Sequence, residues 1–173
     1  MTIVSMKVDL YRQVHLIFNP TIRDFVLNML SYAPAGFFER PAGTVHHLLD
    51  ERGEGGNLLH TIRVVSVVLV IIDISTIKGI EKDVLIASAI LHDLCRYGIE
   101  DEFDYSHESH PQLVRRMAED HSLTCDQFYL IMRIIENHMG RWGEPSFIPH
   151  ISLDGVLHFA DCIEAHLPEV IQC

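Results

Sequence analysis

The chain has 173 residues and a formal net charge of −11, with 13 lysines and arginines against 24 aspartates and glutamates. This length suits one domain that buries its own core without disulfides. Hydrophobic residues make up 48% and charged residues 21%, which excludes a globally disordered chain. The acidic balance disfavours a general nucleic-acid coat protein, which needs a basic surface. The most informative count is 12 histidines, a heavy load for a residue that is not among the common ones.

The sequence also bears on the cellular compartment. Four cysteines lie far apart and form no paired motif: Cys95, Cys125, Cys162 and Cys173. We therefore expect mostly buried, reduced thiols in a cytoplasmic protein. The longest apolar stretch, 64–72, contains a serine and is bracketed by Arg63 and Asp73. It falls short of the roughly 20 residues that a membrane span needs, so we expect no membrane association.

Turn residues and apolar spacing divide the chain into predicted helices. Asn19-Pro20 predicts a helix start, with proline at the first helical position. Proline and glycine near 34–36, 41–43 and 53–56 break the first third of the chain. Apolar residues three and four apart then predict helices over 25–30, 84–91, 113–118, 128–135 and 153–163. We expect Asp126 and Ser152 to cap the last two of these helices.

The segment 64–72 is ambiguous by itself. Its β-branched residues would suit a buried strand. Propensity is a weak guide, however, and no partner strands are found elsewhere, so we predict a central buried helix. The expected fold is then all-α: a compact bundle of about six or seven helices. We expect residues 1–173 to form a single domain, with 1–40 as an N-terminal helical extension and 41–166 as the core.

An adjacent His92-Asp93 pair closes the apolar run 84–91. At the end of a buried helix both side chains can reach one metal ion, and their donor atoms suit Mn, Fe or Zn. The His92-Asp93 pair alone is weak evidence for a metal site, because hydrogen bonding at a helix end explains it equally well. Four more residues of ligand type lie on other predicted helices, at an end or on a face: His60, His110, His138 and Asp161. Ligands that project inward from facing helices build binuclear metal sites in bundles.

In this order the ligand-type residues resemble the HD superfamily of metal-dependent phosphohydrolases. Gly55-Gly56-Asn57-Leu58-Leu59-His60-Thr61 is similar to the segment that carries the first histidine of the family, and 83–93 is similar to the segment that ends in its HD pair. Arg96 stands in the place of the usual lysine, and Cys95 in that of the usual glycine. The resemblance covers roughly residues 41–166, most of the chain.

Two finer resemblances point to subgroups. Pro41-Ala42 with His46-His47, and the segments 138–145 and 157–161, are similar to the HD domain of 3′→5′ exoribonucleases, although Asn137-His138 stands where those enzymes often have two histidines. More distantly, His110-Pro111 is similar to a motif of the HD-GYP cyclic-dinucleotide phosphodiesterases, whose GYP signature the chain lacks.

The HD resemblance implies two divalent transition metal ions, with Fe or Mn favoured and Co, Ni or Zn as alternatives. It implies one metal on His60, His92, Asp93 and Asp161, and a second on Asp93, His110 and His138. A carboxylate has two oxygens and can bridge the metals, so Asp93 is both ligand and catalytic residue. Two metals about 3.5–4 Å apart clamp the attacking and leaving oxygens of a phosphoryl displacement and activate a water molecule.

Three residues are candidates for substrate binding. The planar guanidinium of Arg96 suits a phosphate oxygen, so we expect it to act as a catalytic clamp. Arg141, in the glycine-bounded loop 140–143, is a second candidate. For each arginine the alternative is a solvated charge or an internal salt bridge. His47, next to His46, would line the substrate cleft; alternatively, one of the two caps a helix and the other faces solvent.

Two further histidines are expected beside the ligands. His107 competes with His110 as a ligand, because residues three apart share a helix face. We favour His110, since Pro111 follows it and it opens a predicted helix. His158 lies three residues before Asp161, and we expect it to orient a ligand from outside the coordination sphere.

The favoured function is a metal-dependent phosphohydrolase or phosphodiesterase that hydrolyses a nucleotide-like phosphoester. One alternative is a mixed-valent di-iron oxygenase, because some HD proteins use the same ligands for oxygen chemistry. The other alternative is a non-catalytic regulatory domain that binds a nucleotide or a metal. Hydrolysis is favoured because it needs only metals, water and phosphate-binding cations. The acidic charge points to a small-molecule substrate rather than a long nucleic acid. The sequence leaves a homo-oligomer open.

Overall fold

The structure is a computed structural model that describes residues 1–43, 47–104, 109–140 and 152–170. Across these residues it contains helices and no strand, which confirms the all-α prediction. The elements are α1 (Ile3–Val14), α2 (Pro20–Ser31), α3 (Ala35–Glu39), the 3-10 helix η1 (Leu49–Glu51), α4 (Gly56–Ile74), α5 (Ile80–Leu91), α6 (His110–Asp120), α7 (Phe128–Asn137) and α8 (Leu153–Val170). The described ranges thus hold eight α-helices rather than six or seven, because α1 and the short α3 were not predicted.

Helices α4 and α5 form a hairpin at the centre of the bundle. Segment 64–72 is part of α4, so the helix prediction for this ambiguous stretch is confirmed. Every residue of α5 from Asp83 to Leu91 is buried, as expected for a helix that is apolar on nearly every side. Because the two helices run in opposite directions, the end of α5 returns to the beginning of α4. This return brings His92 beside His60.

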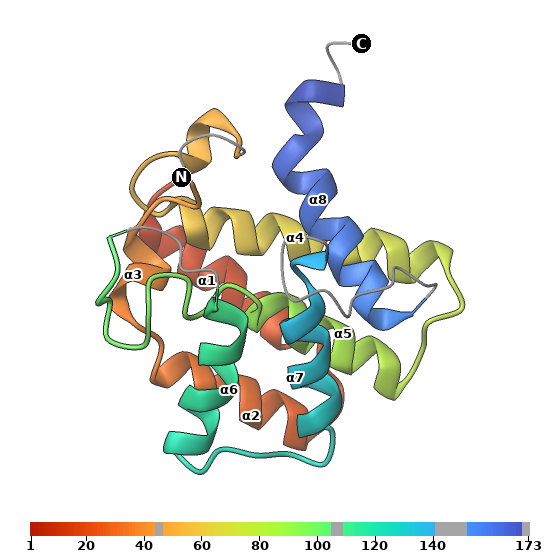
Figure 1. The fold of residues 1–173 in the computed structure, drawn as a ribbon. Helices are drawn as coiled ribbons and strands as arrows, with labels where there is room; N and C mark the ends of the chain where they lie inside the picture. Colours follow the sequence, from red (N-terminus) through yellow and green to blue (C-terminus); the bar gives the residue numbers. More distant parts are fainter. Residues whose placement is uncertain (44–46, 105–108, 141–151, 171–173) are drawn as a thin grey trace.

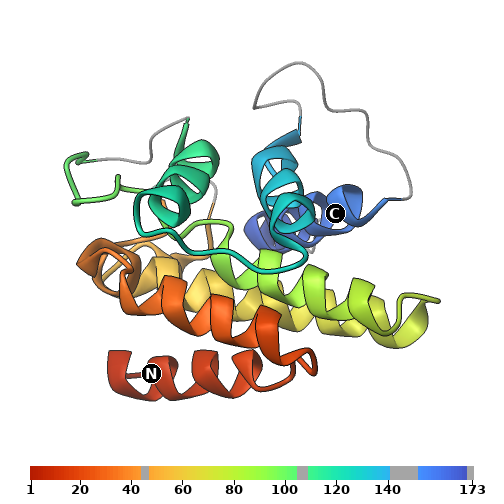
Figure 2. The same cartoon turned by 90° about the horizontal axis from the view of Figure 1, so that it is seen from below.

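The other helices cover the two faces of this hairpin. Helix α1 packs on α4 and α5 from one side, and α7 and α8 pack on them from the opposite side. Figure 2 shows these layers, with α1 at the bottom and α6, α7 and α8 at the top. In Figure 1, α7 crosses in front of α5, and α8 lies next to α7. The site described below lies between the hairpin and this second layer.

Local signals set several helix ends. The side chain of Asn19 accepts hydrogen bonds from the backbone of Thr21 and Ile22, and Pro20 occupies the first turn of α2, as predicted. The hydroxyl of Ser152 accepts from the backbone N–H of Gly155 at 3.4 Å, which fits its predicted capping position. The prediction for Asp126 is wrong by one residue, because Gln127 occupies the N-cap of α7 and makes no side-chain cap bond.

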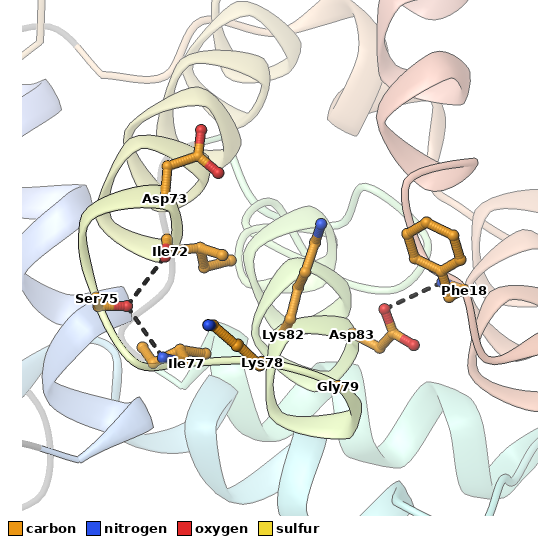
Figure 3. Close-up of a pocket in the computed structure, with 9 residues that line it drawn as sticks. All are labelled: Phe18, Ile72, Asp73, Ser75, Ile77, Lys78, Gly79, Lys82 and Asp83. Carbon is orange, nitrogen blue, oxygen red and sulfur yellow. Dashed lines mark hydrogen bonds between the residues drawn. The ribbon is translucent and has the colours of Figure 1, made fainter.

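The closed end of the hairpin, between the end of α4 and the start of α5, lies at the opposite end of these helices from His60 and His92. There the buried carboxylate of Asp83 accepts a hydrogen bond from the backbone N–H of Phe18 at 3.0 Å (Figure 3). It accepts a second from the backbone N–H of Asn19 at 2.7 Å, and the two bonds fix the α1–α2 turn. A pocket of about 410 Å³ opens beside it, lined in part by Ile72, Lys78 and Lys82. The pocket contains none of the predicted site residues.

By length and composition α4 could cross a membrane, since it has 19 residues and a mean hydropathy of 1.9. It is the one helix in the described part of the chain of which this holds. Long core helices of soluble proteins have the same composition, and α4 packs against α1, α3, α5 and α8. It also carries His60 and Arg63. These features fit the core helix of a soluble bundle.

Candidate metal centre

The start of α4 is held tightly against the segment before it. The backbone N–H groups of Gly55 and Asn57 donate to the carbonyl oxygens of Glu39 and Arg40 at 2.8 and 3.0 Å. A Cβ atom on Gly56 would lie 1.8 Å from the carbonyl oxygen of Glu51, so only glycine fits there. The glycine pair of the sequence motif therefore allows the close approach that buries His60.

His60 joins the first half of the site. Its Nε2 atom lies 3.1 Å from Oδ1 of Asp161 on α8 and 3.8 Å from Oδ2 of Asp93. Its ring centroid is 5.5 Å from that of His92. The ligand atoms of His60, His92 and Asp161 all lie within 4.8 Å of one another. Residues from α4, from α8 and from the turn after α5 thus converge on one point.

His110 and His138 form the second half. Their Nε2 atoms lie 3.4 Å apart, and both face Oδ1 of Asp93, at 2.9 Å from His110 and 3.6 Å from His138. Oδ2 of the same carboxylate lies 3.7 Å from Nε2 of His92. Each oxygen of Asp93 therefore faces a different half of the site. A bridging carboxylate needs this arrangement.

Backbone carbonyl groups orient two of the rings. His92 and His138 are the C-cap residues of α5 and α7. Their Nδ1 atoms lie 2.8 Å from the oxygen of Ala89 and 2.6 Å from that of Ile135, each three residues earlier. A carbonyl oxygen only accepts, so Nδ1 carries the proton and Nε2 faces the site. The two rings are presented in the form that binds a metal.

Unpaired buried polar atoms also indicate that these residues form a metal centre. Among the predicted ligands, three buried polar atoms make no hydrogen bond of good geometry with any described residue: Nε2 of His60, Nε2 of His92 and Oδ1 of Asp93. Buried polar atoms are normally satisfied, and a group of them pointing at one place indicates an absent partner. Imidazole nitrogen and carboxylate oxygen together suit Mn, Fe or Zn.

The charges of the site are strongly coupled. Burial opposes charge on His60, but the carboxylates of Asp161 and Glu164 outweigh it and raise the pKa of His60 to about 10. Burial lowers the pKa of His92 to about 4, although the Asp93 charge opposes this shift. Against the effect of burial, Arg96 and the neighbouring histidines hold the pKa of Asp93 well below its usual range. Near pH 7 the metal-free site therefore holds ionised Asp93, neutral His92 and protonated His60.

A comparison with family models identifies this arrangement. The HD domain family matches residues 58–166, the greater part of the chain. The chain belongs to the HD domain family. No curated protein and no solved structure matches it significantly. The match is to the HD domain as a whole, so the finer resemblances to exoribonucleases and to HD-GYP enzymes stay predictions. From here on, the six residues His60, His92, Asp93, His110, His138 and Asp161 are called the HD centre.

Arg96 lies at the rim of the HD centre. Its Nη1 atom pairs with Oδ2 of Asp93, and its Nη2 atom lies 3.2 Å from Nε2 of His47. Two of the three side chains predicted to bind substrate, Arg96 and His47, are therefore adjacent to the site, and Arg96 is also the partner of a predicted ligand. His47 is only 7% exposed, and burial lowers its pKa.

A second buried group lies behind His60, and the sequence analysis missed it. Glu51 and Glu164 are 0% and 2% exposed, and Oε2 of Glu164 lies 2.5 Å from Nδ1 of His60. Arg63 donates to Oε1 of Glu51 at 2.6 Å. Burial raises the pKa of Glu164 to about 7. Helical spacing could have found two of these residues, because Arg63 follows His60 by three positions and Glu164 follows Asp161 by three.

The remaining predicted residues divide into two groups. Nδ1 of His158 lies 2.7 Å from the carbonyl oxygen of His138, so His158 contacts the backbone of a predicted ligand rather than its ring. Gly140 has a φ of +55°, and a Cβ there would lie 2.4 Å from the ring of His158, so glycine permits this contact. Arg141 and His107 lie outside the described residues. The choice between His107 and His110 therefore stays a prediction, although His110 faces Asp93.

Proposed function

We propose that this HD domain is a metal-dependent phosphohydrolase that acts on a small, nucleotide-like phosphoester. The observation that carries the proposal is the placement of Asp93 between two groups of histidines, with one carboxylate oxygen facing each group. A mononuclear site would need only one of these groups. The double arrangement supports a binuclear hydrolytic centre.

Every residue of the HD centre has a place in this proposal. His60, His92, Asp93 and Asp161 would hold one metal ion, and Asp93, His110 and His138 would hold the other. When bound, divalent metal ions supply Lewis acidity toward a phosphoryl oxygen and lower the pKa of a water molecule. The carbonyl groups that accept from Nδ1 of His92 and His138 keep both rings oriented.

Arg96 and His47 would receive the substrate. The Arg96 guanidinium is fixed at the rim by Asp93 and His47, with 14% of its side chain exposed. Its planar donors suit two phosphate oxygens. His47 is kept neutral near pH 7 by burial, which lowers its pKa, so its ring can donate or accept a hydrogen bond. Arg141 completes the proposed phosphate-binding set.

Charge supports a small substrate rather than a long nucleic acid. The chain carries a net charge of −11. Several of its arginines are paired with carboxylates: Arg63 with Asp50 and Glu51, Arg115 with Glu136, and Arg133 with Asp154. A groove that tracks a nucleic-acid backbone needs unpaired cations along its length. The observed pairing takes three of the 13 lysines and arginines away from such a groove.

We also propose a cytoplasmic setting and a single domain in which residues 1–40 extend an HD core of 41–166. Within the described residues no disulfide joins the cysteines; Cys95 is buried, and Cys125 and Cys162 are partly buried. Reduced thiols of this kind are typical of a reducing compartment. Helices α1 and α2 pack on the α4–α5 hairpin, which supports one continuous core.

The test is hydrolysis by the purified protein loaded with Mn²⁺ or, without oxygen, Fe²⁺. The substrates are p-nitrophenyl phosphate, bis-p-nitrophenyl phosphate, nucleoside monophosphates, a cyclic nucleotide and a 20-nucleotide RNA. We expect turnover of at least one small phosphoester and little of the RNA. Oxygen consumption without hydrolysis would overturn the proposal in favour of the oxygenase. Tight nucleotide binding without turnover by metal-loaded protein would overturn it in favour of a regulatory domain.

A further inference from the structure

His60 is oriented differently from two other histidines of the HD centre. The Nδ1 atoms of His92 and His138 face carbonyl oxygens of their own helices. His60 lies in the second turn of α4, and its Nδ1 atom faces a side chain of another helix. That side chain is Glu164 on α8, whose Oε2 atom lies 2.5 Å away. A carboxylate here takes the place that a backbone carbonyl has beside the other two rings.

This contact is buried and enclosed. His60 is 0% exposed and Glu164 is 2% exposed, so water does not compete for the bond. A hydrogen bond between a ring N–H and a buried carboxylate is stronger than one to a neutral carbonyl. Glu164 and Asp161 lie three residues apart on α8, so one face of this helix contacts both ring nitrogens of His60.

The guanidinium of Arg63 holds the neighbouring carboxylates of Glu51 and Glu164 in place. Nη1 of Arg63 donates to Glu51 at 2.6 Å and lies 3.8 Å from Oε1 of Glu164. Nδ1 of His60 lies 3.8 Å from Oε2 of Glu51, so the nearer acceptor is Glu164. Arg63 also pairs with Asp50 at 2.6 Å, which ties the group to η1. The position of Glu164 is therefore fixed from behind as well as by His60.

We propose that Glu164 is a positioning residue of the HD centre, which keeps a proton on Nδ1 of His60 so that Nε2 is the atom offered to a metal ion. This inference rests on the proposed metal-dependent function. Partners of this kind, outside the coordination sphere, commonly change metal affinity by about 10–100-fold. Glu164 would thus tune the half of the centre that contains His60 without touching metal or substrate.

The experiment compares Glu164→Leu, which removes the acceptor, with Glu164→Gln, which keeps an amide oxygen that accepts. The matched control is Asp83→Asn, which alters an equally buried carboxylate at the far end of the hairpin. Affinity for Co²⁺ is measured at pH 8 by its visible absorption in competition with a chelator. The protonation of the His60 ring is measured by ¹H–¹⁵N NMR on the metal-free and Zn²⁺-loaded proteins.

We expect Glu164→Leu to weaken Co²⁺ binding by about 10–100-fold and to remove the strongly deshielded Nδ1–H resonance of His60. Glu164→Gln is expected to retain that resonance and to recover most of the affinity, and Asp83→Asn to leave both unchanged. An unchanged affinity and resonance in Glu164→Leu would overturn the inference. So would the loss of one whole metal equivalent in both Glu164 variants, because Glu164 would then be a ligand. A wild-type protein that binds no metal would instead overturn the proposed function itself.

Discussion

Oδ1 of Asp93 lies 2.9 Å from Nε2 of His110, although α6 and the turn after α5 are separate elements. The other oxygen of Asp93 faces His60 and His92. Asp93 therefore turns one carboxylate oxygen toward each half of the HD centre, and it carries the binuclear interpretation. The predictions below follow from this position and from the helices that build it.

Asp93→Ala should remove metal and activity together. The variant loses the carboxylate that faces both halves of the HD centre, so we expect a fall in phosphoesterase activity greater than the roughly 10–100-fold that loss of an outer partner costs. Metal analysis, activity and circular dichroism are measured on one preparation. The control Asp154→Ala removes a buried carboxylate that pairs with Arg133. Turnover retained by Asp93→Ala would contradict the assignment.

Arg96→Ala should separate substrate binding from metal binding. Since Arg96 is assigned to the phosphate, its removal should raise KM or lower kcat while the metal content stays that of the wild type. Steady-state kinetics and elemental analysis check this. Arg96 also pairs with Asp93, and a loss of metal in the variant would mean that its main role is to hold that carboxylate.

The central position of α5 predicts a large cost for a cavity there. Leu85 is fully buried, so Leu85→Ala should lower the free energy of unfolding by about 2–5 kcal/mol. Val70 on α4 is 60% exposed, and Val70→Ala should change the free energy of unfolding by no more than about 0.5 kcal/mol. Urea unfolding followed by circular dichroism measures both values. Equal effects of the two substitutions would contradict the central placement of α5.

Much of the fold follows from sequence pattern alone. The helical spacing of apolar residues predicts α2, α5, α6, α7 and α8, and the absence of partner strands correctly favours a helix over 64–72. Helix α1 was missed, although Thr2 and Ser5 form a reciprocal cap at its start. Its buried residues, Met6, Leu10 and Val14, keep the four-residue spacing of an amphipathic helix, so the signal for α1 was present in the sequence.

The site was predictable in part, through its ligand-type residues. The structure brings the six predicted ligands together. Glu51 could not be found from local sequence, because it is distinguished only by tertiary burial near His60, whereas Glu164 is signalled by its three-residue spacing from Asp161. The orienting carbonyls of Ala89 and Ile135 could not be found either, since a backbone group carries no sequence signal.

Metal affinity should rise with pH. The pKa of His60 is raised to about 10, so its Nε2 atom must release a proton before it binds a metal, whereas His92, with a pKa of about 4, releases none. Between pH 6.5 and 8.5 we expect apparent affinity to increase by about tenfold per pH unit for each proton released. Chelator competition at three pH values measures this. A flat profile would contradict the protonated state of His60.

The same proton affects the metal-free fold. Because the folded-state pKa of His60 lies above its ordinary value of 6.5, the proton stabilises the fold below pH 6.5. This contribution is lost as pH rises toward 10. Metal binding replaces it, so the gain in stability on adding metal should be larger at pH 8.5 than at pH 6.5.

Removal of metal by a chelator should lower the melting temperature. A ligand at 100 times its Kd stabilises the folded state by about 2.7 kcal/mol. A domain of this size shifts by about 2–4 °C per kcal/mol, which gives a decrease of about 5–11 °C. Differential scanning calorimetry with and without chelator measures it, and Asp93→Ala should show no such difference. An equal shift in that variant would place the metal elsewhere.

The metal content of the purified protein tests the central claim most directly. The protein is prepared without chelator or added metal and with oxygen excluded, and it is analysed for transition metals by mass spectrometry. We predict two ions per chain, iron or manganese in the main, and fewer than one in Asp93→Ala. Wild-type protein that is free of metal, and that takes up no Mn, Fe, Co or Ni on incubation, would contradict the metal-dependent account.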